Sequence, residues 1–149
     1  RKLLDRGGLI AGTSAGAAVM SETMLVEGES DDTPDVAQIV QMAPGLGFLG
    51  SAIVDMHFAE RGRLGRLLGA IAQNPRMLGI GIDEDTAMIV HGDCLEVMGS
   101  GGVYILDGSK SRRSNVAEAA ADETLAIENV TLHLLSAHRQ YDLEQRQPA

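Results

Sequence analysis

The sequence predicts an α/β fold with a mostly parallel β-sheet and antiparallel hairpins at the edge of that sheet. In the first half of the chain, short apolar runs alternate with helical patterns, which is typical of βαβ units. In the second half, two apolar runs flank a Gly-Asp turn, which predicts a hairpin. The length of 149 residues fits one domain, 1–149.

The first half is expected to begin with a short buried strand that runs into a helix. Residues 9–11 form an apolar run, and the stretch that follows is rich in Ala and Met. From Leu64 onward, apolar residues recur at i, i+3, i+4 and i+7, which indicates an amphipathic helix that Pro75 ends. The expected elements are strand 9–11, helix 15–24, strand 51–56, helix 60–73 and strand 77–82.

The second half is expected to consist mostly of strands. Residues 109–123 are polar and rich in Ala, which predicts a mobile loop with some helix. Residues 27–35 carry five acidic side chains, which predicts a solvent-exposed loop, and residues 141–149 are expected to form a polar, irregular end. The expected strands are 87–90 and 94–98 in the hairpin, then 102–107 and 130–135.

Composition limits the classes of partner. The chain carries 12 Lys and Arg against 21 Asp and Glu, a formal net charge of −9. This balance argues against a nucleic acid or an anionic membrane as partner, since both attract a basic surface. No apolar run approaches the length of about 18 residues that a membrane-spanning helix needs. Neither a Cys/His metal-binding spacing nor a phosphate-binding loop is present, so no metal or cofactor is expected.

The chain opens at Arg1 without an initiator Met and passes from a helix-like tail directly into the first expected strand. We therefore expect the C-terminal part of a longer protein. The single cysteine, Cys94, cannot form an internal disulfide, which fits either a reducing compartment or indifference to the redox state. A cytoplasmic location is expected, while export stays open because a targeting signal would lie upstream of Arg1.

A motif for a nucleophilic serine lies near the start. Gly12–Gly16 reads G-x-S-x-G, between an expected strand and an expected helix. In such a turn the serine has a strained backbone that exposes Oγ, and flanking glycines avoid clashes. Ser14 is therefore the candidate nucleophile, and the N–H of Ala15 is the candidate oxyanion-hole donor. The alternative is that Ser14 only caps the helix.

A nucleophilic serine needs a base and a group that orients the base. Of the four histidines, His57 alone directly follows an expected core strand. The carboxyl ends of parallel strands gather catalytic groups, so His57 is the candidate base, against the alternative of a capping or core histidine. The next strand ends at Asp83, Glu84 and Asp85, and the sequence pattern does not decide which of them orients His57.

Three arginines follow His57. Arg61, Arg63 and Arg66 form a local basic cluster in an acidic chain, and the last two share one flank of the expected helix. Guanidinium groups bind carboxylates in a bidentate manner, so the cluster indicates a substrate with an anionic group. The alternative is a set of salt-bridged surface arginines.

Three segments carry a family resemblance: Gly8–Ala17 (GLIAGTSAGA), Asp55–Leu67 (DMHFAERGRLGRL) and Gly79–Ala87 (GIGIDEDTA). Together they resemble serine peptidase family S51, to which the cyanophycinases belong. The resemblance extends from about Gly7 to Asp107. It implies a flavodoxin-like fold, akin to that of class I glutamine amidotransferases, of which this chain lacks the N-terminal half.

The resemblance also implies an activity and a site. Cyanophycinases cut cyanophycin, a polyaspartate with arginine on its side chains, to β-Asp-Arg dipeptides. By this resemblance Ser14 is the nucleophile, His57 the base and Glu84 the acid. The positions that match the family's substrate pocket are Asp55, Arg61, Arg63 and Arg66.

The chain departs from the family pattern in two ways. Met56 stands where the family usually has Gln before the catalytic His, which bears on the identity of the substrate. The absent half would supply a second oxyanion donor, so the isolated chain is expected to be inactive. An aspartyl dipeptidase of the same family and an inactive binding module are the alternative functions. Dimers are common for such folds, which leaves a homodimer open.

Overall fold

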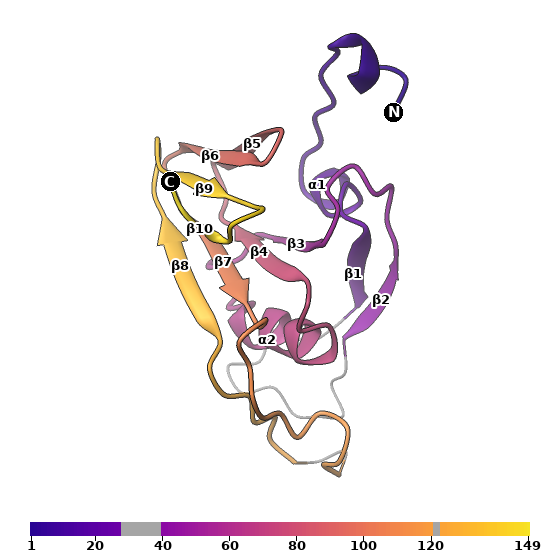
Figure 1. Ribbon diagram of the computed structural model, residues 1–149, viewed down its shortest axis with the longest axis vertical. Coiled ribbons are helices and arrows are strands. Elements are labelled where there is room, and N and C mark those ends of the chain that lie inside the picture. Colours follow the sequence, from indigo (N-terminus) through magenta and orange to yellow (C-terminus); the bar gives the residue numbers. More distant parts are fainter. Residues whose placement is uncertain (28–39, 121–122) are drawn as a thin grey trace.

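The computed structural model describes residues 1–27, 40–120 and 123–149, and it is a mixed α/β structure (Figure 1). A 3-10 turn, η1 (Leu4–Arg6), comes before the main body. The further elements are α1 (Ala15–Ala18), β1 (Thr23–Glu27), β2 (Gln41–Pro44), β3 (Ala52–Met56), α2 (Leu64–Gln73), β4 (Leu78–Ile82), β5 (Thr86–His91), β6 (Cys94–Gly99), β7 (Val103–Asp107), β8 (Thr131–Leu135), β9 (Gln140–Asp142) and β10 (Gln147–Pro148).

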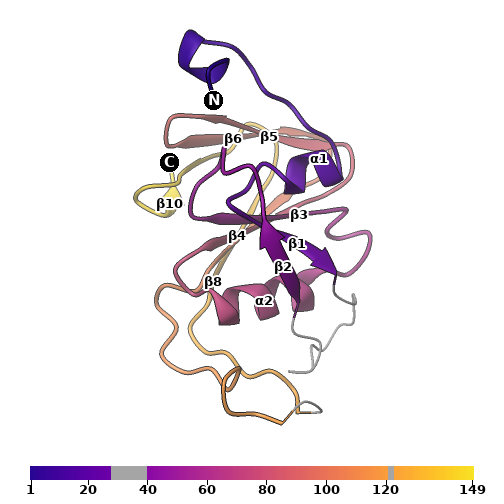
Figure 2. The ribbon, with the colours of Figure 1, turned by 90° about the vertical axis from the view of Figure 1, so that its right-hand side faces the viewer.

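A central four-stranded sheet, ordered β3-β4-β7-β8, lies between two layers. One face packs on the second sheet, β10-β9-β6-β5, where Leu95, Val97 and Tyr141 are fully buried. The other face packs on α2, where Leu67 and Ile71 are fully buried. Figure 2 shows the same order of layers from the side. Because strand β4 is covered on both faces, all five of its residues are buried.

The glycines of β4 allow its neighbours to approach closely. A Cβ atom added at Gly81 would lie 2.4 Å from the ring of Phe58, and one at Gly79 would lie 3.0 Å from Leu67. Phe58 follows His57 directly in the chain. The small residues of β4 therefore determine how close the loop after β3 lies to the central sheet.

The expectation of a mostly parallel sheet is wrong for the described residues. Strands β3 and β4 pair in parallel, whereas the pairs β4–β7 and β7–β8 are antiparallel. A parallel pair needs a crossover, which α2 supplies between β3 and β4. After β4 the chain passes through the β5–β6 hairpin instead, so β7 returns in the opposite direction.

The first expected strand is also wrong. Residues 9–11 belong to no strand in the described structure, and Leu9 is 81% exposed. A strand is stable only where its backbone groups find hydrogen-bond partners, and the described residues offer none to this segment. The apolar pattern of residues 9–11 is typical of a strand, but it does not show whether a second strand is present to pair with it.

The helix expected over 15–24 ends after one turn at Ala18, and Thr23 begins strand β1. Buried Ser21 lies where the helix ends, with its Oγ 2.6 Å from the carbonyl oxygen of Ala18 and 2.7 Å from that of Thr23, and its single proton is available to either carbonyl. A serine hydroxyl that bonds backbone carbonyls competes with helix continuation. The favourable helix propensity of Ala and Met is overridden here.

Most other elements match the expectation within a few residues. The β5–β6 hairpin and strands β3, β4, β7 and β8 are present, and α2 begins at Leu64 rather than near residue 60. The end of the chain is more ordered than expected, because β9 and β10 form there and Tyr141 is fully buried. Arg146 donates to Asp107 at 2.9 Å and attaches this end to the central sheet.

Two expected loops fall partly outside the described residues. The acidic loop over 27–35 lies outside them apart from Glu27, which ends β1. Of the loop over 109–123, the described part contains turns and a bridge from Ser114 to Ile127, and no helix. None of the helices in the described ranges has both the length and the apolar character needed to cross a bilayer.

Candidate active site

The turn at Ser14 holds this residue in a strained conformation. Ser14 has φ 51° and ψ −120°, and α1 starts at the next residue. Non-glycine residues rarely adopt such angles, and the strain is typical of exposed nucleophiles on sharp turns. A Cβ atom at Gly12 would lie 2.3 Å from the carbonyl oxygen of Gly16, so position 12 requires glycine. A Cβ atom at Gly16 would meet no atom within 4 Å, so of the two motif glycines only Gly12 is required to avoid a steric clash.

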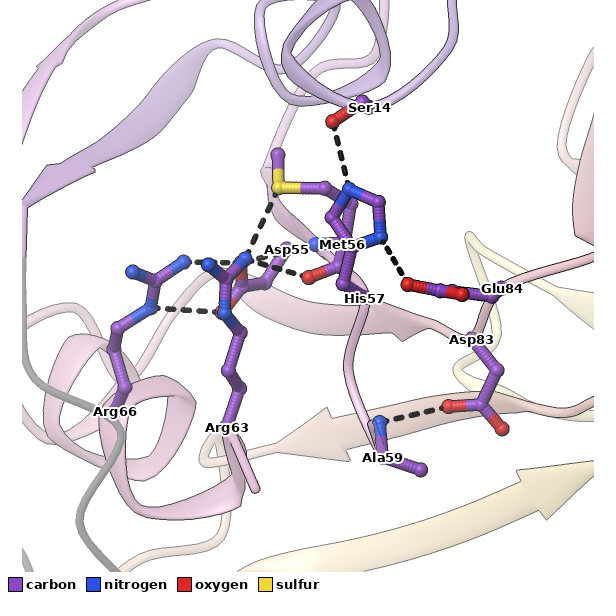
Figure 3. Close-up of polar contacts among 9 residues, drawn as sticks. All are labelled: Ser14, Asp55, Met56, His57, Ala59, Arg63, Arg66, Asp83 and Glu84. Carbon is purple, nitrogen blue, oxygen red and sulfur yellow. Dashed lines mark hydrogen bonds and ion pairs between the residues drawn. The ribbon is translucent and has the colours of Figure 1, made fainter. Parts of the chain in front are cut away.

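His57 connects the serine to a carboxylate. It follows β3 with φ 51°, and its Nε2 lies 2.8 Å from Oγ of Ser14. Its Nδ1 lies 2.9 Å from Oε1 of Glu84 (Figure 3). The imidazole is about one quarter exposed, at 27%, and the Glu84 carboxylate about half, at 54%. The three side chains come from α1's start and from the ends of β3 and β4.

This arrangement suits proton transfer. A carboxylate at Nδ1 favours the tautomer with hydrogen on Nδ1, which leaves Nε2 free to accept the Ser14 hydroxyl proton. The solvent-exposed position of Ser14 leaves room for an incoming carbonyl group. The N–H of Ala15 donates to no acceptor in the described part of the chain, so it can face the oxygen of a reacting carbonyl.

The structure shows which of the three candidate carboxylates, Asp83, Glu84 or Asp85, contacts His57. Glu84 contacts His57, whereas Asp83 turns the other way and accepts the N–H of Ala59 at 2.9 Å (Figure 3). Asp85 lies one residue further along with φ 48°. The backbone turns at Glu84 and Asp85, directly after Asp83, so the side chains of Asp83 and Glu84 leave the chain in different directions.

A buried ion-paired cluster near His57 consists of Asp55, Arg63 and Arg66 (Figure 3). The Asp55 side chain is fully buried, and those of Arg63 and Arg66 are 9% and 8% exposed. Arg63 Nη1 donates to Oδ1 of Asp55 at 3.0 Å, and Arg66 donates from Nε to Oδ2 at 2.9 Å and from Nη2 to Oδ1. Burial lowers the pKa of Arg63, the charge of Asp55 opposes this, and Arg66 and Arg61 lower it further.

The cluster changes the expected substrate pocket. Arg63 and Arg66 both donate to the Asp55 carboxylate, so part of their hydrogen-bonding capacity is used inside the cluster. Met56 covers Arg63 further, with Sδ 3.2 Å and its carbonyl oxygen 2.6 Å from Nη1. Arg61 is exposed. Of the expected substrate-contacting arginines, Arg61 is therefore the accessible one.

One cavity lies beside the loop after His57. It has a volume of about 240 Å³ and is open to solvent, and its lining does not include Ser14. The cavity is lined by Phe58, Ala59, Gly62, Arg63, Leu64, Gly65 and Tyr104. Elsewhere in the described residues, as here, no three metal-ligating side chains converge.

Glu60 belongs to none of the catalytic or substrate-binding positions that the sequence predicted. Its Oε1 accepts the backbone N–H of Glu84 at 3.1 Å, so it contacts the loop that carries the candidate acid. The only signal in the sequence is that Glu60 lies three residues after His57. Spacing alone does not distinguish this carboxylate from an ordinary surface group.

The sharp turn at Ser14, with the hydrogen bonds from Ser14 to His57 and from His57 to Glu84, gives an α/β protein the side-chain arrangement of a serine hydrolase. The model of peptidase family S51 matches residues 1–98, and the chain belongs to this family.

Curated relatives agree with this assignment. The chain is 46% identical over 144 residues to the protein named Cyanophycinase from Trichormus variabilis and to that from Nostoc sp.. It is 44% identical over 140 residues to the protein of the same name from Geminocystis herdmanii. These alignments cover 95%, 95% and 93% of this chain, and 48%, 48% and 51% of the relatives. The chain therefore spans about half the length of the curated relatives it matches.

Proposed function

We propose that the protein is a serine exopeptidase that hydrolyses cyanophycin (multi-L-arginyl-poly-L-aspartate) to β-Asp-Arg dipeptides. The observation that carries this proposal is the continuous contact from Ser14 Oγ through His57 to Glu84, with separations of 2.8 and 2.9 Å. Membership of family S51 and the similarity to proteins named Cyanophycinase support the substrate.

In the proposed reaction, Ser14 Oγ attacks the carbonyl carbon of the scissile amide while His57 Nε2 takes the hydroxyl proton. Glu84 holds the imidazole and stabilises the imidazolium that forms. The N–H of Ala15 donates to the oxyanion of the tetrahedral intermediate. His57 then gives the proton to the leaving amine, and the C–N bond breaks. A water molecule, deprotonated by His57, hydrolyses the acyl-serine in the second half of the reaction.

The proposed substrate contacts divide between the arginines. Arg61 is exposed and would bind an aspartyl carboxylate directly. In the buried cluster, Arg63 and Arg66 bind Asp55, and Arg63 also donates to the carbonyl of Met56, so the cluster supports the backbone that leads to His57. Asp55 thus acts mainly on the two arginines, which is a narrower role than direct substrate binding.

The test is the release of β-Asp-Arg from cyanophycin by the intact protein, followed by mass spectrometry. Ser14→Ala is expected to reduce the release rate by at least about a thousandfold, because the nucleophile is lost. Ser136→Ala, an exposed serine outside the site, serves as the matched control and should keep the original rate. Unchanged release by the Ser14 variant would refute the proposal.

One observation favours an aspartyl dipeptidase as the second candidate. The thioether of Met56 lies against Arg63, at the position where the resemblance to the family leads us to expect Gln. A less polar side chain beside His57 would change which residue the enzyme accepts after the aspartate of its substrate. Parallel assays with cyanophycin and with α-Asp-X dipeptides separate the two peptidases. A binding module without activity would show no labelling of Ser14 by a fluorophosphonate.

A further inference from the structure

The two loops that carry His57 and Glu84 are joined by a reciprocal pair of hydrogen bonds. Glu60, in the first loop, accepts the N–H of Glu84 through Oε1 at 3.1 Å. Asp83, in the second loop, accepts the N–H of Ala59 through Oδ1 at 2.9 Å. Each loop thus supplies one carboxylate to the backbone of the other. We call Glu60 and Asp83 together the carboxylate clasp.

The clasp begins where the β-ladder ends. Strands β3 and β4 pair in parallel up to Met56 and Ile82, and the N–H of Phe58 still donates to the carbonyl of Ile82 at 3.1 Å. Beyond this point the two backbones separate to place His57 and Glu84. Side-chain carboxylates then replace the missing backbone acceptors. Without them, the N–H groups of Ala59 and Glu84 would have to donate to water.

The clasp is also fixed to the next strand. The second oxygen of Asp83, Oδ2, accepts the N–H of Gly102 at 3.0 Å, just before β7. A Cβ atom at Gly101 would lie 2.8 Å from Cβ of Asp83 and 2.7 Å from Oγ1 of Thr86. The close approach therefore depends on a residue without a side chain. Through Asp83, the loop after β3 is tied to both β4 and β7.

We infer that Glu60 and Asp83 are positioning residues, which hold the Glu84 carboxylate at Nδ1 of His57. Glu84 is 54% exposed, and a half-exposed ion pair contributes little by itself, so its geometry must be held from the backbone. Figure 3 shows Asp83 and Glu84 leaving the chain in different directions, the first toward Ala59 and the second toward His57. The catalytic consequence of this inference rests on the proposed function.

A second explanation has to be separated from positioning. Glu60, Asp83 and Glu84 are three carboxylates near one imidazole, and their charge alone could assist His57. The variants distinguish the two effects. Glu60→Ala removes the acceptor and the charge, whereas Glu60→Gln removes only the charge and keeps an oxygen for the N–H of Glu84. Asp85→Asn, in the same loop, is the matched control, because φ 48° suits Asn and the Asp85 side chain bonds no backbone amide of the described residues.

Two readouts are measured on the intact protein. The first is the second-order rate of Ser14 phosphonylation by a fluorophosphonate. The second is the low-field proton resonance of His57 Nδ1–H, assigned by its loss in Glu84→Gln. We expect Glu60→Ala and Asp83→Ala to slow phosphonylation about tenfold and to shift this resonance upfield, while Glu60→Gln and Asp85→Asn stay within about twofold of the unmodified protein.

The outcomes are separable. Thermal melts identify loss of the fold, and Glu60 is exposed, so its variants test the inference even where Asp83→Ala unfolds. The inference is overturned if Glu60→Ala keeps both the rate and the resonance, or if Glu60→Gln is as impaired as Glu60→Ala. A protein that shows no phosphonylation at all would contradict the proposed function instead, and the resonance would still decide whether the clasp positions Glu84.

Discussion

Ser14 and His57 are 43 residues apart in the chain, yet Oγ of Ser14 lies 2.8 Å from Nε2 of His57, and both residues have φ 51°. A non-glycine residue in such a conformation costs about 1–3 kcal/mol. Each strained residue lies at a point where the chain turns sharply, one before α1 and one after β3. The fold therefore stores backbone strain at both ends of one hydrogen bond.

The two motif glycines are expected to respond differently to the same substitution. Gly12→Ala would place its Cβ 2.3 Å from the carbonyl of Gly16 and displace Ser14, whereas Gly16→Ala meets open space. A displacement of about 1 Å at a nucleophile can cost about a hundredfold in rate. We expect that loss of phosphonylation rate in Gly12→Ala and a nearly unchanged rate in Gly16→Ala. Equal rates for the two variants would contradict the geometry of the turn.

Asp55 is expected to be essential for stability. Asp55→Ala removes the buried carboxylate to which both Arg63 and Arg66 donate. Breaking a buried ion pair in this way costs about 3–5 kcal/mol. Urea unfolding should show this loss in Asp55→Ala, whereas Asp93→Ala at an exposed turn should stay within about 0.5 kcal/mol. A stable Asp55→Ala variant would mean that the cluster does not support the loop after β3.

Asp107 is expected to make stability depend on acid pH. Burial alone would raise the pKa of Asp107, but hydrogen bonds from Ser109 and the guanidinium of Arg146 outweigh it and hold the pKa below its usual value. A lowered pKa in the folded state means that the stabilisation is present above the unfolded-state pKa of about 3.9 and is lost as pH falls through the folded-state pKa.

The measurement is the free energy of unfolding in urea between about pH 6 and pH 2. Asp107→Asn should flatten the acid part of this curve, and Asp5→Asn, near the exposed start of the chain, should not. A curve for Asp107→Asn as steep as that of the unmodified protein would show that another carboxylate controls acid unfolding.

Tyr141 is expected to tolerate loss of its hydroxyl but not of its ring. The ring is fully buried, and its hydroxyl has no hydrogen-bond partner in the described residues. Tyr141→Phe removes an unpaired polar group and should leave stability unchanged or raise it. Tyr141→Ala removes the ring from the core between the two sheets and should cost about 3–5 kcal/mol.

The same residue predicts a loss of stability in alkali. Burial, together with the charge of Asp107, raises the pKa of Tyr141 to about 12. The unfolded state ionises first, so stability should fall as pH rises from about 10, the ordinary tyrosine pKa, toward 12. Tyr141→Phe should abolish this part of the decline in unfolding experiments at alkaline pH. An identical decline in Tyr141→Phe would assign it to other groups.

Local patterns in the sequence identified those features that depend on a few neighbouring residues. The helical spacing from Leu64 predicted α2, the Gly-Asp turn predicted the β5–β6 hairpin, and the G-x-S-x-G motif located the turn at Ser14. Each of these depends on periodicity or on turn chemistry within about a dozen residues, which a single sequence displays directly.

The tertiary structure decided how distant groups are paired. It brought Glu84 rather than Asp83 to His57, a choice that the family resemblance implied and the local pattern left open, paired both Arg63 and Arg66 with Asp55, and buried Tyr141 in an end expected to be irregular. Among the described residues it also provided no sheet neighbour for residues 9–11. A hydrogen bond or a strand needs a partner at a set distance and direction, and strand register and loop path determine which partner arrives. No periodicity in the chain contains that information.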